Sequence, residues 1–209
     1  MISQVESELF SLLAPERTLL LVVDVQNDFC HDEGVLGRAG VPLGAIQAAA
    51  ETLLQFTEVA RRARVPIVFI KTHHDPSNNS PAWLSKMRGR AACTTGSWGA
   101  DFYRLRPTDA DAVVVKHRYS GFVGTNLEVI LRSLGRPTLL LTGITTNVCV
   151  ESTARDAFMR DYHVFLVEDC AAAPTKEEHQ STVYNIRTCF GYVLDSSTVA
   201  AFWGEAKAP

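Results

Sequence analysis

Hydrophobic residues along this chain form short unbroken runs, separated by longer segments in which they recur every three or four positions. The short runs are rich in Val, Ile and Leu and cover residues 18–25, 66–71, 112–116, 137–142, 164–168 and 191–194. An unbroken run of this length is typical of a strand that is buried on both faces of a sheet. The pattern therefore predicts six buried strands.

The segments between these runs have the periodicity of helices. The expected helices cover residues 44–64, 126–134, 147–160, 176–189 and 197–203. Strands that alternate with crossover helices form a parallel sheet, because the connections are right-handed. We therefore expect residues 1–209 to form a single α/β domain. Its core would be a doubly wound, Rossmann-like, mostly parallel six-stranded sheet with helices on both faces.

Residues 72–107 show neither pattern. This segment is rich in Pro, Ser, Asn and Gly, and it holds Trp83 and Trp98. A long irregular segment inside a compact α/β domain is commonly a functional loop or lid. We expect it to cover the site, either as a lid or as part of a subunit interface. The alternative is a surface excursion that packs its tryptophans on the core.

Composition and charge exclude several classes of partner. The chain has 209 residues, of which 46% are hydrophobic and 21% charged, and its net charge is −3. These values are ordinary for a globular protein and give no electrostatic footprint for nucleic acid or an anionic membrane. The apolar runs are far shorter than a membrane span, and residues 1–13 lack a basic region and a cleavage site. We therefore expect a cytoplasmic protein with no nucleic-acid or membrane partner.

The cysteines do not suggest a disulfide framework. There are five of them, an odd number, widely spaced and without a C-x-x-C pair: Cys30, Cys93, Cys149, Cys170 and Cys189. This arrangement argues against disulfides and against a thiolate zinc site. We expect reduced thiols that are mostly buried.

Three polar residues stand where predicted strands end. Asp24 ends the first run, Lys116 ends the third, and Cys149 begins the helix that follows the fourth. Ligands of open α/β sheets bind beyond the carboxyl ends of the strands, so these three side chains should meet at one edge. Each alone has a structural explanation: Asp24 as a cap, Lys116 as a solvated strand end, Cys149 as a core thiol. The coincidence of all three favours a site.

Together these residues predict acyl transfer to sulfur followed by hydrolysis. A thiol at a helix N-terminus beside an ammonium should have its pKa lowered from about 8.5 toward neutrality. Asp24 could take the thiol proton and pass it to a leaving amine, while Lys116 orients the acid. Backbone N–H groups of residues 143–149 could stabilise a developing oxyanion.

The chain resembles the isochorismatase-like cysteine hydrolases in three motifs. Residues 22–29 read VVDVQNDF, residues 115–122 read VKHRYSGF, and residues 143–150 read GITTNVCV. The resemblance implies a catalytic triad of Asp24, Lys116 and Cys149. It also implies a cis peptide bond at Ile144–Thr145 that aims the N–H groups of Thr145 and Cys149 at the oxyanion. Relatives form dimers and tetramers, so we expect a homo-oligomer.

Within this family, the cysteine at position 149 favours an amidase over a true isochorismatase. Residues 95–103, 116–119 and 149–157 are most similar to the ureidoacrylate amidohydrolases, biuret hydrolases and N-carbamoylsarcosine amidases.

The substrate pocket is expected to have aromatic walls and an amide. The candidates are Asn27, Phe29, Trp83, Tyr119 and Phe122, which suit a small planar urea-like group. Asn27 and Tyr119 have equally plausible structural roles.

No metal or cofactor is expected. Nicotinamidases of the family commonly carry an Asp-x-His and a later His after the second strand, whereas residues 71–76 read KTHHDP here, with no further His before His117. His73 and His74 are more simply loop residues near the mouth of the site.

The predicted function is cysteine-dependent hydrolysis of a non-peptide C–N bond in a small ureido or carbamoyl compound, of the biuret or ureidoacrylate type. The reaction would release ammonia through a thioester. The alternatives are a nicotinamidase-like or other simple carboxamide hydrolase and a non-catalytic α/β ligand-binding module. Dinucleotide binding is excluded, because no G-x-G-x-x-G follows the first strand.

Overall fold

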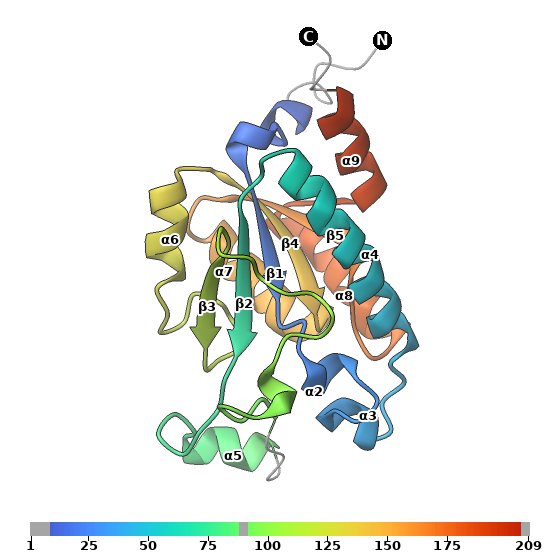
Figure 1. Ribbon diagram of the computed structural model, residues 1–209. Coiled ribbons are helices and arrows are strands. Elements are labelled where there is room, and N and C mark those ends of the chain that lie inside the picture. Colours follow the sequence, from blue (N-terminus) through green and yellow to red (C-terminus); the bar gives the residue numbers. More distant parts are fainter. Residues whose placement is uncertain (1–8, 88–91, 206–209) are drawn as a thin grey trace.

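Figure 1 shows the computed structural model, which describes residues 9–87 and 92–205. Six strands form one sheet in the order β3-β2-β1-β4-β5-β6. They are β1 (Thr18–Val23), β2 (Ile67–Thr72), β3 (Ala112–Lys116), β4 (Thr138–Ile144), β5 (His163–Ala172) and β6 (Tyr192–Leu194). Each neighbouring pair is parallel. The predicted class, a doubly wound six-stranded α/β fold, is confirmed.

The helices of the described residues include several short ones in the connections. They are α2 (Asn27–Cys30), α3 (Val35–Arg38), α4 (Gly44–Arg62), α5 (Pro81–Met87), α6 (Leu127–Leu134), α7 (Glu151–Phe158), α8 (Lys176–Asn185) and α9 (Ser196–Glu205). Shorter turns are the 3-10 helices η1 (Pro15–Arg17) and η2 (Trp98–Ala100) and the π-helical turns η3 (Thr146–Val150) and η4 (Ile186–Phe190).

Helices cover both faces of the sheet (Figure 1). Leu20 and Val22 of β1 point into the core that includes residues of α4 and α9, whereas Leu19, Leu21 and Val23 belong to the core that includes residues of α6, α7 and α8. Successive side chains of a strand point to opposite faces, so a strand covered on both sides must be apolar throughout. This explains the unbroken hydrophobic runs.

The strand order reverses between β1 and β4, which lie side by side at the centre. β2 and β3 continue on the β1 side, and β5 and β6 on the β4 side. Ligands of such sheets bind where the order reverses, beyond the carboxyl ends of the strands. In this fold the crevice lies beyond the ends of β1 and β4. We therefore expect the residues that follow these two strands to line it.

Three predicted elements differ in detail. β5 continues to Ala172 rather than ending at 168, with a register shift against β4 between Leu141 and Gly143. The helix expected over 147–160 begins as the π-helical turn η3 before α7. The irregular segment 72–107 contains α5 and η2, and residues 88–91 of it lie outside the described part.

Candidate active site

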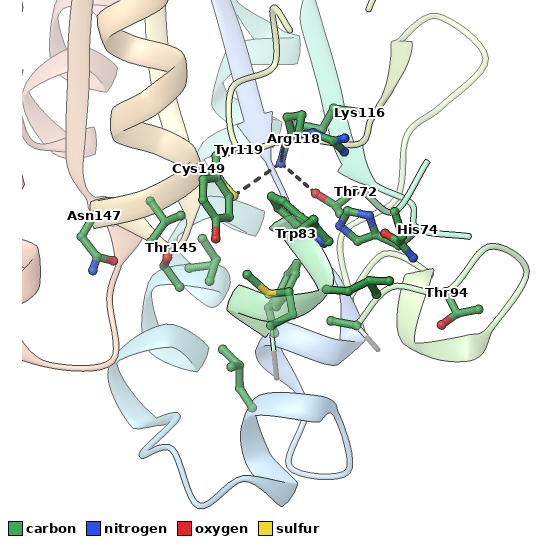
Figure 2. Close-up of a pocket in the computed structure, with 18 of the residues that line it drawn as sticks. Thr72, His74, Trp83, Thr94, Lys116, Arg118, Tyr119, Thr145, Asn147 and Cys149 are labelled. Atoms are coloured by element: carbon green, nitrogen blue, oxygen red, sulfur yellow. Dashed lines mark hydrogen bonds between the residues drawn. The ribbon is translucent and has the colours of Figure 1, made fainter. Parts of the chain in front are cut away.

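Asp24, Lys116 and Cys149 meet at the carboxyl edge of the sheet, as predicted. Asp24 follows β1, Lys116 is the last residue of β3, and Cys149 lies in η3 after β4. Lys116 Nζ lies 2.6 Å from Asp24 Oδ2. It also lies 3.4 Å from Cys149 Sγ, a contact drawn as a dashed line in Figure 2. All three side chains are buried. Removing one partner of a buried ion pair would leave the other buried without a counter-charge, so Lys116 and Asp24 depend on each other.

Thr72, the last residue of β2, bridges the ion pair. Its hydroxyl donates to Asp24 Oδ1 at 3.0 Å and accepts from Lys116 Nζ at 2.7 Å. Lys116 Nζ also donates to the Arg118 carbonyl at 3.1 Å. Four neighbouring strand ends thus supply the groups around this ammonium.

The pKa of Cys149 does not follow the expectation. Burial raises the pKa of this thiol, the Asp24 carboxylate raises it further, and Lys116 opposes both only in part. Burial would lower the pKa of Lys116, but Asp24 and Cys149 beside it raise this pKa above its usual value. The predicted lowering of the Cys149 pKa is therefore wrong, because desolvation outweighs the ammonium. The arrangement is a thiol next to an ion pair.

The backbone between β4 and Cys149 has an unusual course. The Ile144–Thr145 peptide bond is cis, as the resemblance implied, and Gly143 before it has a φ of 112°. The carbonyl of Thr145 accepts from the N–H groups of Val148 and Val150 at 3.2 and 3.3 Å. This turn carries Thr145 and Cys149 on the same wall of the site.

Lys116 and Cys149 line a cavity of about 500 Å³ (Figure 2), and Asp24 lies behind Lys116. Its lining combines strand ends with residues of the irregular segment and of α3, α5, η3 and α8. Besides Lys116 and Cys149 it includes Phe29, Leu36, Thr72, His74, Asp75, Pro76, Asn79, Trp83, Leu84, Met87, Ala92, Thr94, Arg118, Tyr119, Ile144, Thr145, Asn147, Val148, Pro174 and Glu178. A cavity of this size and largely apolar lining suits a small molecule.

Four of the expected pocket residues line this cavity: Phe29, Trp83, Tyr119 and Thr145. The Trp83 ring lies 5.0 Å from the Tyr119 ring and 4.9 Å from the His74 ring. These aromatic contacts attach the irregular segment to the residues that follow β3. The irregular segment therefore forms one wall of the cavity, as expected of a segment that covers the site.

Asn27 and Phe122 do not line the cavity, which corrects the prediction for both. The Asn27 amide donates to the Trp98 carbonyl at 2.8 Å and so fixes η2 in place. Phe122 is buried in the core on the α6 and α7 face, with the Arg160 guanidinium 4.7 Å from its ring. Both residues belong to the sequence motifs that the chain shares with the family, but their side chains pack against other parts of the protein instead of lining the cavity.

Several residues of the cavity were not among the predicted pocket residues. Thr72 follows the same rule of polar strand ends that identified Lys116, and that rule could have found it. Arg118 stands in the second motif. His74 is buried, and burial lowers its pKa, which favours a neutral imidazole. Asn79 gives no signal in the sequence, because its position depends on the irregular segment.

Three polar atoms of the cavity wall are buried without a hydrogen-bond partner among the described residues. These atoms are His74 Nδ1, Asn79 Oδ1 and Asn147 Oδ1. Buried polar atoms are rarely left without partners, so each such atom calls for an explanation. The three atoms have almost no accessible surface, so they do not face the open cavity.

Within residues 9–87 and 92–205, no group of three or more His, Cys, Asp or Glu side chains is arranged to hold a metal ion. His74 lies in the cavity wall, while His73 offers its carbonyl 2.7 Å from His117 Nδ1. No helix in that part of the chain is long and apolar enough to span a bilayer.

The chain belongs to the isochorismatase family, whose Isochorismatase domain matches residues 18–198. It is 38% identical over 215 residues to the ureidoacrylate amidohydrolase of Methylobacterium radiotolerans, covering 94% of this chain and 82% of that relative. A cysteine hydrolase from Pseudomonas syringae pv. phaseolicola superposes with a TM-score of 0.82 at 26% identity, covering 92% of this chain and 94% of the other. The N-carbamoylsarcosine amidase of Thermoplasma acidophilum gives a TM-score of 0.73 at 32% identity, covering 86% and 96%.

Proposed function

We propose that this protein is a cysteine amidohydrolase that cleaves a non-peptide C–N bond in a small ureido or carbamoyl compound. The observation that carries the proposal is the buried Lys116 ammonium, 2.6 Å from Asp24 and 3.4 Å from Cys149, at the inner end of the cavity. The similarity to a ureidoacrylate amidohydrolase over 94% of the chain supports the ureido class of substrate.

Asp24 acts as the base in the proposed reaction. Since burial raises the pKa of the Cys149 thiol, the sulfur must lose its proton as it attacks, and the adjacent carboxylate is placed to receive it. Sγ then bonds to the substrate carbonyl carbon, whose oxygen becomes an oxyanion. The N–H groups of Thr145 and Cys149 would stabilise this charge.

The remaining steps return the enzyme to its starting state. Protonated Asp24 gives its proton to the leaving nitrogen, the C–N bond breaks, and the acyl group stays on Sγ as a thioester, or as a thiocarbamate for a ureido group. Asp24 then takes a proton from water, whose oxygen attacks the same carbon. The C–S bond breaks, and Sγ takes that proton back from Asp24, which restores the thiol and the carboxylate. Lys116 orients Asp24 during these transfers, together with Thr72.

We also propose the context in which the enzyme works. Residues 1–209 would form one hydrolase domain that needs no metal or cofactor. Five free cysteines are compatible with the reducing cytoplasm. Exposed apolar side chains such as Val129 and Met159, 71% and 75% accessible, are compatible with a homo-oligomer, a dimer or tetramer. Light scattering after gel filtration measures that state.

An ammonia-release screen tests the proposed function. The panel contains ureidoacrylate, biuret, N-carbamoylsarcosine and nicotinamide, each with enzyme before and after dialysis against a chelator. We expect fastest release from a ureido or carbamoyl compound, at the same rate after dialysis. Release from nicotinamide alone would indicate a simple carboxamide hydrolase, and no release from any compound would indicate a binding module. Dependence on added zinc would contradict the metal-free mechanism.

A further inference from the structure

Resting on the proposed function, we propose that the substrate is a ureido acid, and that Arg118 binds its carboxylate and sets this specificity. Arg118 comes two residues after Lys116 and lines the same cavity. In Figure 2 it lies with Trp83 and His74 on one side of Cys149, while Thr145 and Asn147 lie on the other. A molecule with its carbonyl at Cys149 can therefore extend toward a cationic wall.

The Arg118 guanidinium is held in position without being neutralised. One terminal nitrogen donates to the carbonyls of Asn78 and His117, at 3.1 and 2.5 Å, and the guanidinium carbon lies 5.3 Å from the centre of the Trp83 ring. No acidic side chain of the described residues pairs with it. Nε and the other terminal nitrogen remain as donors, the pair that binds a carboxylate in fork geometry.

The other charged groups of the cavity do not neutralise Arg118. Lys116 is paired with Asp24. Asp75 and Glu178 keep their negative charges, but Asp75 accepts hydrogen bonds from Ser77 and Thr95, Glu178 caps α8 through Thr175, and neither forms an ion pair with Arg118. Among the described lining residues, Arg118 is thus the cation without a counter-charge. An arginine that is fixed in a largely apolar cavity attracts an anionic ligand more strongly than the same arginine would in bulk water.

The Tyr119 hydroxyl suits the ureido part of such a substrate. Tyr119 lines the cavity and is 36% exposed, so its hydroxyl can donate to a ureido carbonyl or accept from a ureido N–H (Figure 2). The Trp83 ring lies between this group and His74, in tilted contact with both rings. The cavity therefore offers one carboxylate site and a hydroxyl for an N–H or carbonyl group. Neutral amides such as biuret or nicotinamide would leave the Arg118 donors unpaired, which carries a desolvation cost.

Kinetics on a matched substrate pair test the role of Arg118. The pair is 3-ureidoacrylate and its N,N-dimethylamide, which lacks the negative charge, and ammonia release is measured. We expect the wild-type enzyme to favour the acid by about 100-fold in kcat/KM, the value of a charged hydrogen-bonded contact. Arg118→Gln should remove this preference, mainly through KM for the acid, and change kcat/KM for the dimethylamide less than about threefold. Arg118→Lys should restore part of it.

Lys86→Gln is the control variant, because it removes one positive charge from α5 without touching the cavity lining. It should leave the preference unchanged. An equal loss on both substrates in Arg118→Gln would show a structural role and overturn the inference. So would a wild-type enzyme that favours the neutral compound.

A binding measurement separates this inference from the proposed function. Calorimetry with Cys149→Ala should show tighter binding of 3-ureidoacrylate than of its dimethylamide, and the double variant Cys149→Ala/Arg118→Gln should lose that difference. Equal binding of both compounds by Cys149→Ala would overturn the Arg118 assignment even if ureido compounds are hydrolysed. Absence of turnover by the wild-type enzyme would contradict the proposed function, while the binding ratio still decides the carboxylate site.

Discussion

At the scale of single residues, Cys149 shows how burial and charge compete. A thiol near the start of a helix and beside an ammonium is expected to ionise easily, but this one is buried against a carboxylate as well as a lysine. Desolvation and Asp24 outweigh Lys116, so the pKa of the thiol rises. In the proposed reaction Asp24 therefore takes the thiol proton at each attack, instead of a thiolate being present beforehand.

Alkylation measures this property directly. With iodoacetamide near neutral pH, we expect Cys149 to react more slowly than the exposed Cys189. Because the Cys149 pKa is raised, its thiolate fraction and its rate should increase as the pH is raised well above neutrality. Mass spectrometry of the peptides gives both rates, with Cys189→Ala as the control. Preferential labelling of Cys149 near pH 7 would show a stabilised thiolate.

Thr72 is predicted to act through the position of its neighbours. Thr72→Val keeps the shape but removes the hydroxyl that links Asp24 to Lys116. We expect kcat to fall by about tenfold, equivalent to about 1.4 kcal/mol, with little change in KM. Steady-state kinetics measures both. Thr57→Val is the matched control, because Thr57 is also buried but bonds to Leu54 in α4. A similar loss in the control would refute the positioning role.

Candidate site residues can be predicted from the sequence when the sheet topology alone determines their position. Asp24 and Lys116 are found because any parallel sheet brings polar strand ends together. Asn27 and Phe122 stand in equally specific motifs, yet their side chains turn into the protein, and no pattern of residue types shows this direction. His74 lies in an irregular segment whose path depends on tertiary contacts such as the Trp83 ring.

At the scale of elements, the turn after β4 depends on a glycine. Gly143 has a φ of 112°, and a Cβ atom there would lie 2.0 Å from the carbonyl oxygen of Val23 in β1. Any side chain must therefore push apart the two central strands. The π-helical turn that follows could not be predicted, since its residues carry ordinary helical periodicity.

Gly143→Ala should therefore destabilise the protein by about 3 kcal/mol or more, since the clash is with backbone and the φ is unfavourable. Urea unfolding measures the loss. Gly44→Ala is the matched control, because a Cβ at Gly44, at the start of α4, meets nothing within 4 Å. It should be neutral or slightly stabilising. Wild-type stability in Gly143→Ala would contradict the steric argument.

Glu151 ties α7 to α8. Its carboxylate accepts from Thr182 at 2.5 Å, from Asn185 at 3.1 Å and from Arg155. Burial would raise the pKa of Glu151, but these hydrogen bonds and the Arg155 charge lower it below the usual value. A lowered pKa means that the stabilisation is present above the unfolded-state pKa and is lost as pH falls through the folded-state pKa.

Glu151→Gln should accordingly cost about 2 kcal/mol of unfolding free energy at pH 7. The difference from wild type should shrink as the pH falls below about 4, where the wild-type carboxylate becomes protonated in the unfolded chain and then in the folded protein. Urea titrations at a series of pH values measure it. Glu177→Gln, in the first turn of α8, is the control. A pH-independent difference would contradict the linkage.

At the scale of the whole molecule, topology assembles the site from distant parts of the chain. Asp24, Thr72, Lys116 and Cys149 stand at or just after the carboxyl ends of four strands that lie adjacent in the order β3, β2, β1 and β4 (Figure 1). The alternation of strands and helices predicts such a sheet, and the fold confirms it. The cavity above that edge is finished by the irregular segment, whose shape follows from contacts that only the folded molecule provides.

The proposed function requires Cys149 to be the nucleophile of an amidohydrolase. Its most direct test is the rate of ammonia release by Cys149→Ala on the best ureido substrate, compared with Cys189→Ala. Loss of an attacking group typically costs about 10⁴-fold or more in kcat. We predict a loss of that size in Cys149→Ala, with its fold unchanged by circular dichroism, and wild-type rates in Cys189→Ala. Turnover by Cys149→Ala within tenfold of the wild-type rate would contradict the account.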